Sequence, residues 1–426
     1  MNDTKNPIFS REFFLLSIWA FLASNNFYSL LTAVPLFAMN KLGLGEAEAG
    51  LATGLFIAGM LCSRFAAGKL TEKLGFRTML IGNLICVIIF TLLYFVITNA
   101  PTLYIIRILG GIFYGLFINT VHTMVSTIIP KSRLGEGIGY YAMIQMSSWA
   151  VGPSLSLFFA NRGDFSAIFT YCTILPVVIL ITVPFFRMSR IHDALASDKA
   201  LKGRAEPVLP IGGSELPAHR ETFLEKFLAP SVLPISAVCL FFLMFNTAAS
   251  SFAAPFAATI GLAEPASAFF IFYAIGMLGI RPIISRIFDK KGGTFALIPS
   301  VCIYVIAYLI LASINSPFTL LLSALLLGVG FGACQNTALA LSLKTVPRKR
   351  LGFANATFYA TLDGCSALGP IIAGLLIPSL GYRYMYTVAA IWTAVGLIIY
   401  FILRPRINKS IAAQQTDTLP IFPPGS

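Results

Sequence analysis

The sequence has few charged residues, and this scarcity excludes an ordinary soluble protein. Only 11% of its 426 residues are charged, and its mean hydropathy is +0.83. A soluble domain has about 25% charged residues. A chain in water could not bury this much apolar surface, so we expect most of it to lie in lipid.

The sequence also lacks the spacings that mark catalytic and metal sites. Its seven cysteines all lie in apolar runs, and none has the Cys-x-x-Cys or Cys/His spacing of a zinc site or a disulfide framework. It has no Walker loop, no Gly-x-Ser-x-Gly elbow and no His-Glu-x-x-His pair. We therefore expect neither an enzyme nor a cofactor or metal. The net charge of +13 forms no basic face with interleaved aromatics, so nucleic acid is not an expected partner.

Twelve apolar stretches are each about long enough to cross a bilayer as a helix. The first six lie near 13–37, 47–67, 78–97, 102–128, 137–160 and 167–186, and the second six near 229–258, 265–284, 295–313, 317–343, 353–377 and 384–403. The sequence therefore predicts an all-α integral membrane protein. Its expected parts are a six-helix bundle over 1–187, a linker over 188–226, a second six-helix bundle over 227–406 and a polar tail over 407–426.

The second set of stretches repeats the first at a fixed offset. Arg64 returns as Arg281, which is 217 positions later, and the same offset relates three pairs of glycines: Gly75 and Gly292, Gly111 and Gly328, Gly152 and Gly369. Two like halves in an apolar chain indicate a membrane transporter whose site lies between the halves.

Basic residues predict the orientation. One set of loops contains Lys69, Lys73, Arg77, Lys131, Arg133, Arg286, Lys290, Lys291, Arg348, Lys349 and Arg350, whereas the loops on the other side contain only Lys41, Arg162 and Arg383. Cytoplasmic loops are enriched in Lys and Arg. We therefore expect a multi-pass protein of the cell membrane, in contact with lipid, with both termini in the cytoplasm.

The loop between the second and third stretches contains Gly68, Glu72, Gly75 and Arg77, and its repeat contains Asp289 and Gly292. Glycine permits close helix packing and a tight turn. The carboxylate can cap a helix or pair with a basic residue across the seam between the halves. A pair that forms in only one conformation would act as a latch. An ordinary charged turn is the alternative, but the second copy favours a gating loop.

This loop resembles the signature G-x-L-a-D-r-x-G-r of the major facilitator superfamily. The sequence matches it at Gly68, Leu70, Lys73 and Gly75, and Glu72 replaces the usual Asp. The resemblance covers nearly the whole chain. It implies two pseudo-symmetric six-helix halves that rock about a central site, a monomer, and loops that control gating rather than the choice of substrate.

Two further patterns are similar to motifs of that superfamily. Arg107 lies inside the fourth stretch, four residues before Gly111, as in an R-x-x-x-G motif that is associated with proton transfer. A charge in lipid is costly, so Arg107 should face the interior, although it could instead extend to the interface. In the fifth stretch an antiporter-like pattern includes Gly139, Ser148, Gly152 and Pro153. It marks exporters in the superfamily, and simple small-residue packing is the alternative.

Asp363 is the only acidic residue near the middle of an apolar stretch, about 15 Å deep at 1.5 Å per residue. An ionised carboxylate there is costly, so we predict that it exchanges protons and couples them to transport, with Arg107 adjusting it. It could instead bind a cationic group of the substrate, or be a structural residue capped by Thr361 or Ser366.

Other polar residues within the apolar stretches are candidates for the substrate cavity, since buried amides and hydroxyls need partners. They are Asn25, Asn26, Gln145, Asn246, Gln335 and Tyr359. The repeat mates Arg64 and Arg281 could contact the gating loops or an anionic substrate, or extend towards lipid headgroups.

The combined pattern predicts a secondary transporter that exports a small amphiphilic molecule in exchange for protons, by alternating access. Among members of the superfamily, the chain most resembles drug, opine and sugar exporters. Uptake or exchange of a small nutrient is the first alternative, and a membrane sensor without transport is the second.

Overall fold

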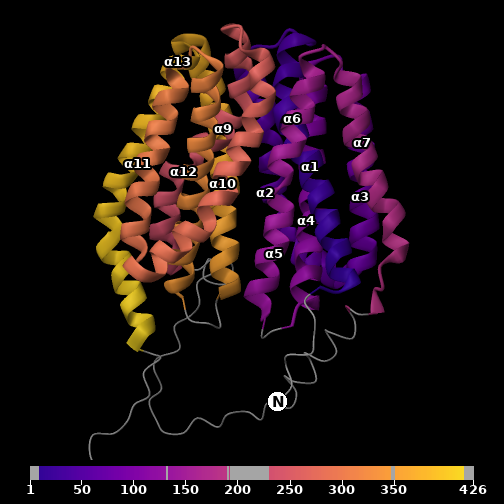
Figure 1. The fold of residues 1–426 in the computed structure, drawn as a ribbon. Coiled ribbons are helices and arrows are strands. Elements are labelled where there is room, and N and C mark those ends of the chain that lie inside the picture. The colour runs from indigo at the N-terminus through magenta and orange to yellow at the C-terminus, as the bar shows by residue number, and fades with distance from the viewer. Residues whose placement is uncertain (1–8, 131–132, 190, 192–229, 347–350, 417–426) are drawn as a thin grey trace, which may run out of the picture.

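The computed structural model describes residues 9–130, 133–189, 191, 230–346 and 351–416. These segments are helical apart from short connections and contain no strand. Figure 1 shows two groups of helices side by side, one formed by the N-terminal half of the chain and one by the C-terminal half.

The N-terminal half has six spans. Its helices are α1 (Arg11–Asn40), α2 (Glu46–Leu74), α3 (Phe76–Leu92) with η2 (Leu93–Val96), α4 (Ala100–Ile128), α5 (Leu134–Met146), α6 (Ser148–Ala160), and α7 (Phe165–Thr182) with η4 (Val183–Phe185). The backbone of Ser147 stays in the right-handed helical region, with φ −62° and ψ −18°, so α5 continues into α6 as one span.

The C-terminal half has the same number of spans. Its helices are η5 (Pro230–Val232), α9 (Leu233–Thr259), α10 (Ala263–Lys291), α11 (Gly293–Ala312), α12 (Pro317–Lys344) and α13 (Leu351–Thr416). Gly381, with φ 78°, divides α13 into two helices. By length and hydropathy, nine helices of the described segments can cross a membrane, and the bent α2 makes ten. The pair α5 and α6 and the second part of α13 complete the twelve.

Two of the predicted boundaries between the parts of the chain bear comparison with the structure. Residues 192–229, which make up most of the predicted linker over 188–226, lie outside the described segments. Near the C-terminus, α13 continues to Thr416, beyond the boundary at 406 that we predicted between the second bundle and the polar tail.

The sequence repeat is also a repeat of helix packing. A Cβ atom added to Gly111 of α4 would overlap the carbonyl oxygen of Phe56 in α2. A Cβ added to Gly328 of α12 would likewise overlap the carbonyl oxygen of Tyr273 in α10. Each residue of the second pair follows its counterpart by 217 positions. Both halves therefore use a glycine to bring their second and fourth spans together.

The halves meet where α2 packs on α13, α6 on α10 and α1 on α9. We call the end of the bundle with the turns at Gly75 and Gly292 the basic end. At the opposite end, α2 and α13 are so close that a Cβ at Gly50 would overlap the carbonyl oxygen of Pro370, and a Cβ at Gly374 that of Glu46.

The apolar core supports the same picture. One cluster of buried side chains runs through both halves and includes Phe37, Trp149 and Phe256, whereas Phe13 and Trp19, near the basic end of the N-terminal half, belong to a separate cluster. The described part of the molecule is therefore joined most closely at the opposite end.

Candidate functional site

Asp363 forms an ion pair with Arg64 across the seam between the halves. The guanidinium Nε of Arg64 in α2 donates to the carboxylate Oδ2 of Asp363 in α13. Asp363 is only 6% exposed. Arg64 lies ten residues from the end of α2, and Asp363 twelve from the start of α13, so both are about 15–18 Å from the basic end. The predicted acidic residue and one of the predicted arginines thus form a single unit.

The same contact occurs a second time in altered form. Arg281 of α10 is the repeat mate of Arg64, and its guanidinium contacts the sulfur of Met146 in α5. Met146 is itself the mate of Asp363, since 363 − 146 and 281 − 64 both equal 217. Each half thus directs an arginine at the equivalent position of the other half, but only one of the two positions is acidic.

Arg281 is half-buried, and its environment is poor in compensating charge. Among the described residues no carboxylate pairs with it, and its Nε is buried without a hydrogen-bond partner. The phenol groups of Tyr28 and Tyr359 lie near it. The seam therefore contains two guanidinium groups and one carboxylate within its polar centre.

Aromatic rings cross the seam beside these charges. Tyr28 of α1 packs on Trp149 of α6, with ring centroids 4.3 Å apart, and Trp149 stacks on Tyr273 of α10 at 5.1 Å. We call these three residues the aromatic bridge. Tyr359 adds a fourth ring, whose centroid is 5.8 Å from the guanidinium carbon of Arg64. Flat apolar rings beside charges suit an amphiphilic ligand.

Arg107 lies elsewhere. It is 1% exposed, and its Nε donates to the carbonyl oxygen of Ala52 at 2.9 Å and its Nη1 to the hydroxyl of Tyr94 at 3.2 Å. The ring of Phe56 is 4.3 Å from its guanidinium carbon. These contacts stay within the N-terminal half. The structure does not bring Arg107 against Asp363, and its role in proton coupling stays a prediction.

Two of the predicted cavity asparagines join helices. Asn25 accepts a hydrogen bond of 2.7 Å from the hydroxyl of Tyr171. Asn246 accepts hydrogen bonds from two hydroxyls, those of Tyr273 at 2.9 Å and Tyr304 at 2.8 Å. Tyr273 belongs to the aromatic bridge, so Asn246 fixes one of its rings. Direct contact of either asparagine with substrate stays a prediction.

The remaining predicted cavity amides differ in their surroundings. Asn26 donates to the carbonyl oxygen of Cys172, and Gln145 donates to the hydroxyl of Ser24 at 3.0 Å. The side-chain oxygen of Gln335 is buried without a hydrogen-bond partner. Of the oxygens of these three amides, that of Gln335 is therefore the one that is fully buried without a partner in the described segments.

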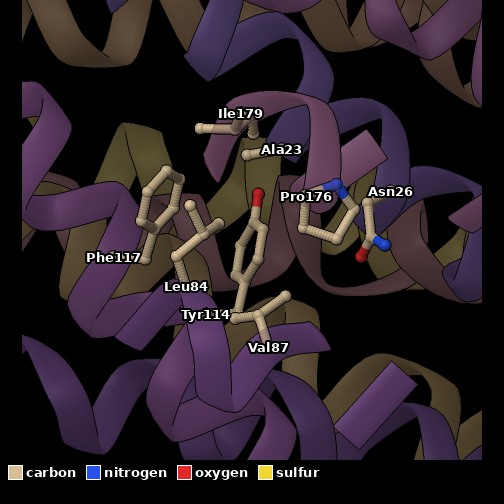
Figure 2. Close-up of a pocket in the computed structure, with 8 residues that line it drawn as sticks. All are labelled: Ala23, Asn26, Leu84, Val87, Tyr114, Phe117, Pro176 and Ile179. Carbon is tan, nitrogen blue, oxygen red and sulfur yellow. The ribbon is translucent and has the colours of Figure 1, made fainter. Parts of the chain in front are cut away.

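Asn26 also borders a small cavity inside the N-terminal half (Figure 2). The wall is otherwise formed by Ala23, Leu84, Val87, Tyr114, Phe117, Pro176 and Ile179, and the volume is about 10 Å³. This is room for about one water molecule. The cavity is too small for a transported molecule and does not lie on the seam.

The two predicted gating loops share one backbone conformation. Gly75 and Gly292 have φ values of 79° and 84°, which favour glycine. Glu72, Arg77 and Asp289 are exposed, and a Cβ at Gly68 would meet open space. Neither loop carboxylate is ion-paired within the described segments, so the latch stays a prediction.

The antiporter-like pattern coincides with close packing of α1 and α6. A Cβ at Gly152 would lie 2.8 Å from the carbonyl oxygen of Asn25, whereas one at Gly139 would meet open space. Ser148 and Pro153 are buried in α6. Close packing explains the small residue at 152, and the direction of transport that the pattern implies stays a prediction.

Twelve spans in two repeats, with an ion pair across their seam, define a secondary transporter. The family model of the Major Facilitator Superfamily matches residues 16–361 and 296–424. The chain belongs to this superfamily, as the sequence resemblance implied, and it is a multi-pass membrane transporter rather than an enzyme.

Curated relatives include exporters. A multi-drug resistance efflux pump PmrA homolog of Lactococcus lactis is 25% identical over 94% of this chain and 96% of its own length. The multi-drug resistance efflux pump PmrA of Streptococcus pneumoniae is 24% identical over 88% and 91%. Solved structures share the fold at low identity. A POT family transporter in complex with a thioalcohol conjugated peptide has a TM-score of 0.74 at 15% identity, with 93% of this chain and 96% of that chain covered. The nucleoside transporter NupG has a TM-score of 0.68 at 15% identity, with 93% and 99% covered.

Proposed function

We propose that the protein exports a small amphiphilic molecule in exchange for protons, with the ion pair of Arg64 and Asp363 as the coupling element. The observation that carries this proposal is the pair itself, because it joins the two halves at a buried carboxylate. The similarity to efflux pumps supports the outward direction.

Coupling follows from competition at one carboxylate. When Asp363 takes up a proton it loses its charge, and its attraction to Arg64 falls to that of a neutral hydrogen bond. A basic or hydrogen-bond-donating group of the substrate needs the same carboxylate in its ionised form. Proton and substrate therefore exclude each other, which is the requirement for exchange rather than co-transport.

Release of Arg64 from Asp363 also changes how firmly the two halves are held together. The pair connects α2 to α13 in the basic half of the seam, whereas glycine packing at Gly50 and Gly374 closes the opposite end. Breaking the pair weakens one closure without touching the other, so protonation shifts the balance between two states of the seam. We place the basic end in the cytoplasm, because the loops at that end are rich in Lys and Arg.

The direct test is ethidium transport in proteoliposomes with an imposed pH gradient. We expect the wild-type protein to move ethidium against the proton flux and D363N to fall to the rate of empty liposomes. The matched control is E264Q, which removes an exposed carboxylate in the first turn of α10. Proton-coupled flux that persists in D363N would overturn the mechanism, and uptake coupled to proton entry would favour a nutrient importer.

A further inference from the structure

We propose that the molecule this protein transports best carries an anionic group, and that Arg281 binds this group. The inference rests on the proposed function in calling the ligand the transported molecule. Its structural basis is the unequal pair of contacts across the seam, in which Arg64 meets Asp363 and Arg281 meets Met146.

Within the described segments, Arg281 lacks the counter-charge that its repeat mate Arg64 has in Asp363. The repeat directs it at the position that is acidic in the other copy, and a thioether there is only a weak acceptor. A half-buried guanidinium without a counter-charge is costly. Among the described residues no carboxylate compensates it, and its Nε remains without a hydrogen bond. A ligand carboxylate would supply both the charge and the acceptor.

The neighbours of Arg281 indicate the rest of the ligand. Tyr28 and Tyr359 lie near its guanidinium, and Tyr28 begins the aromatic bridge across the seam. An aromatic body against these rings would place its anionic group towards Arg281. Since a basic group would also compete with the proton at Asp363, an aromatic zwitterion satisfies both positions.

Four probes of one shape test this. They are 2-naphthoate, its uncharged methyl ester, the cation 2-naphthylmethylammonium and the zwitterion 6-(aminomethyl)-2-naphthoate. Binding to the purified full-length protein in a neutral detergent is measured by calorimetry at constant pH. We expect the wild-type protein to prefer naphthoate to the ester by about tenfold or more, as for one charge-assisted hydrogen-bonded pair. We expect the zwitterion to bind more tightly than naphthoate, and D363N to lose this difference.

Two variants remove the anion site in opposite ways. R281Q deletes the cation, whereas M146D keeps it and supplies the acid that the other half already has. Both should abolish the preference for naphthoate while binding the ester as the wild type does, which shows that the site is folded. R281K should keep part of the preference, and R162Q, at an exposed arginine of the opposite end, should keep all of it.

Several outcomes would overturn the inference: equal wild-type binding of acid and ester, an undiminished preference in R281Q, or a zwitterion that binds no better than naphthoate. Displacement of naphthoate by phosphatidylglycerol but not by phosphatidylcholine would assign Arg281 to a lipid phosphate and overturn it as well. The flux test is separate. Loss of proton coupling in D363N with no effect of R281Q on probe binding refutes this inference alone. Persistent coupling in D363N with the expected probe results refutes only the exchange mechanism.

Discussion

Trp149 of α6 and Tyr273 of α10 stack across the seam, with ring centroids 5.1 Å apart and an angle of 21° between their planes. One ring comes from each half, so relative movement of the halves separates or slides them. A ligand that enters the seam would meet these rings beside the charged centre.

The first prediction concerns this stack. We expect W149A to weaken ethidium binding by about three- to tenfold, the value of one aromatic pair, whereas W149F should retain most of the affinity. Binding is measured by ethidium fluorescence with purified protein. W392F is the control, because Trp392 stacks on Phe241 within the C-terminal half. An equal loss in W149F and W149A would show that the ring surface is not what binds.

The second prediction concerns the ion pair. R64Q leaves a buried carboxylate without its counter-charge, and D363N leaves a guanidinium without a charged partner, so each should lower thermal stability in detergent. The double variant should lose less than the sum of the two, with a coupling of about 1–3 kcal/mol. Strictly additive losses would mean that the pair contributes nothing to the stability of this state.

The third prediction concerns closure of the opposite end. A side chain at Gly50 would collide with the carbonyl oxygen of Pro370, and such overpacking costs about 1–3 kcal/mol. In a cysteine-free background, we expect G50V to lengthen the distance between spin labels at Lys41 and Tyr384. The control is G82A, since a Cβ at Gly82 meets open space. An unchanged distance in G50V would contradict tight closure there.

The fourth prediction separates two roles for Arg107. Its hydrogen bonds to Ala52 and Tyr94 predict that R107Q loses about 1.5–3 kcal/mol of stability but keeps the pH midpoint of transport. Thermal unfolding and a pH series of ethidium flux measure the two effects. A shifted midpoint at unchanged stability would instead support an influence of Arg107 on Asp363.

The fifth prediction concerns pH at the start of α5. Arg133 donates two hydrogen bonds of 2.9 Å to the exposed Glu136, and they hold the pKa of that carboxyl below its usual value. The carboxylate therefore stabilises the folded turn above the ordinary glutamate pKa of about 4.3. This contribution to stability disappears as the pH falls through the lowered pKa of Glu136.

Amide hydrogen exchange in the first turn of α5, corrected for intrinsic rates, should accordingly increase as the pH falls below the ordinary glutamate pKa of about 4.3. E136Q should already exchange faster at neutral pH and show no such step. Because the pair is exposed, about 1 M salt should reduce the difference between the two proteins. A step that persists in E136Q would assign it to another group.

The sequence was sufficient for the features that repeat. Gly75 and Gly292 mark both tight turns, and the 217-residue offset anticipates the equivalent packing of α2 on α4 and of α10 on α12. The rotation of each helix about its axis could not be predicted. Lipid-facing and buried faces are both apolar here, so no amphipathic pattern distinguishes them.

The candidate site shows the same limit. Asp363 is conspicuous in the sequence, but its partner Arg64 is 299 positions away, and nothing local indicates which of several arginines would reach it. One signal in the sequence could have indicated the second contact. Subtracting the 217-residue offset from Asp363 gives Met146, the residue that Arg281 contacts. Asn25 and Asn246 resemble cavity residues in sequence, yet their oxygens serve tyrosines of neighbouring helices.

The presence of Met146 at the position where the other half has Asp363 also has a geometric consequence. A scaffold built from two equivalent halves would accept any ligand in two poses, related by half a turn about the axis between them. With a carboxylate on one side only, those poses differ in energy, and a molecule with unlike ends has a single preferred direction. The internal repeat supplies the twofold frame, and the unmatched pair of Asp363 and Met146 helps to make its interior directional.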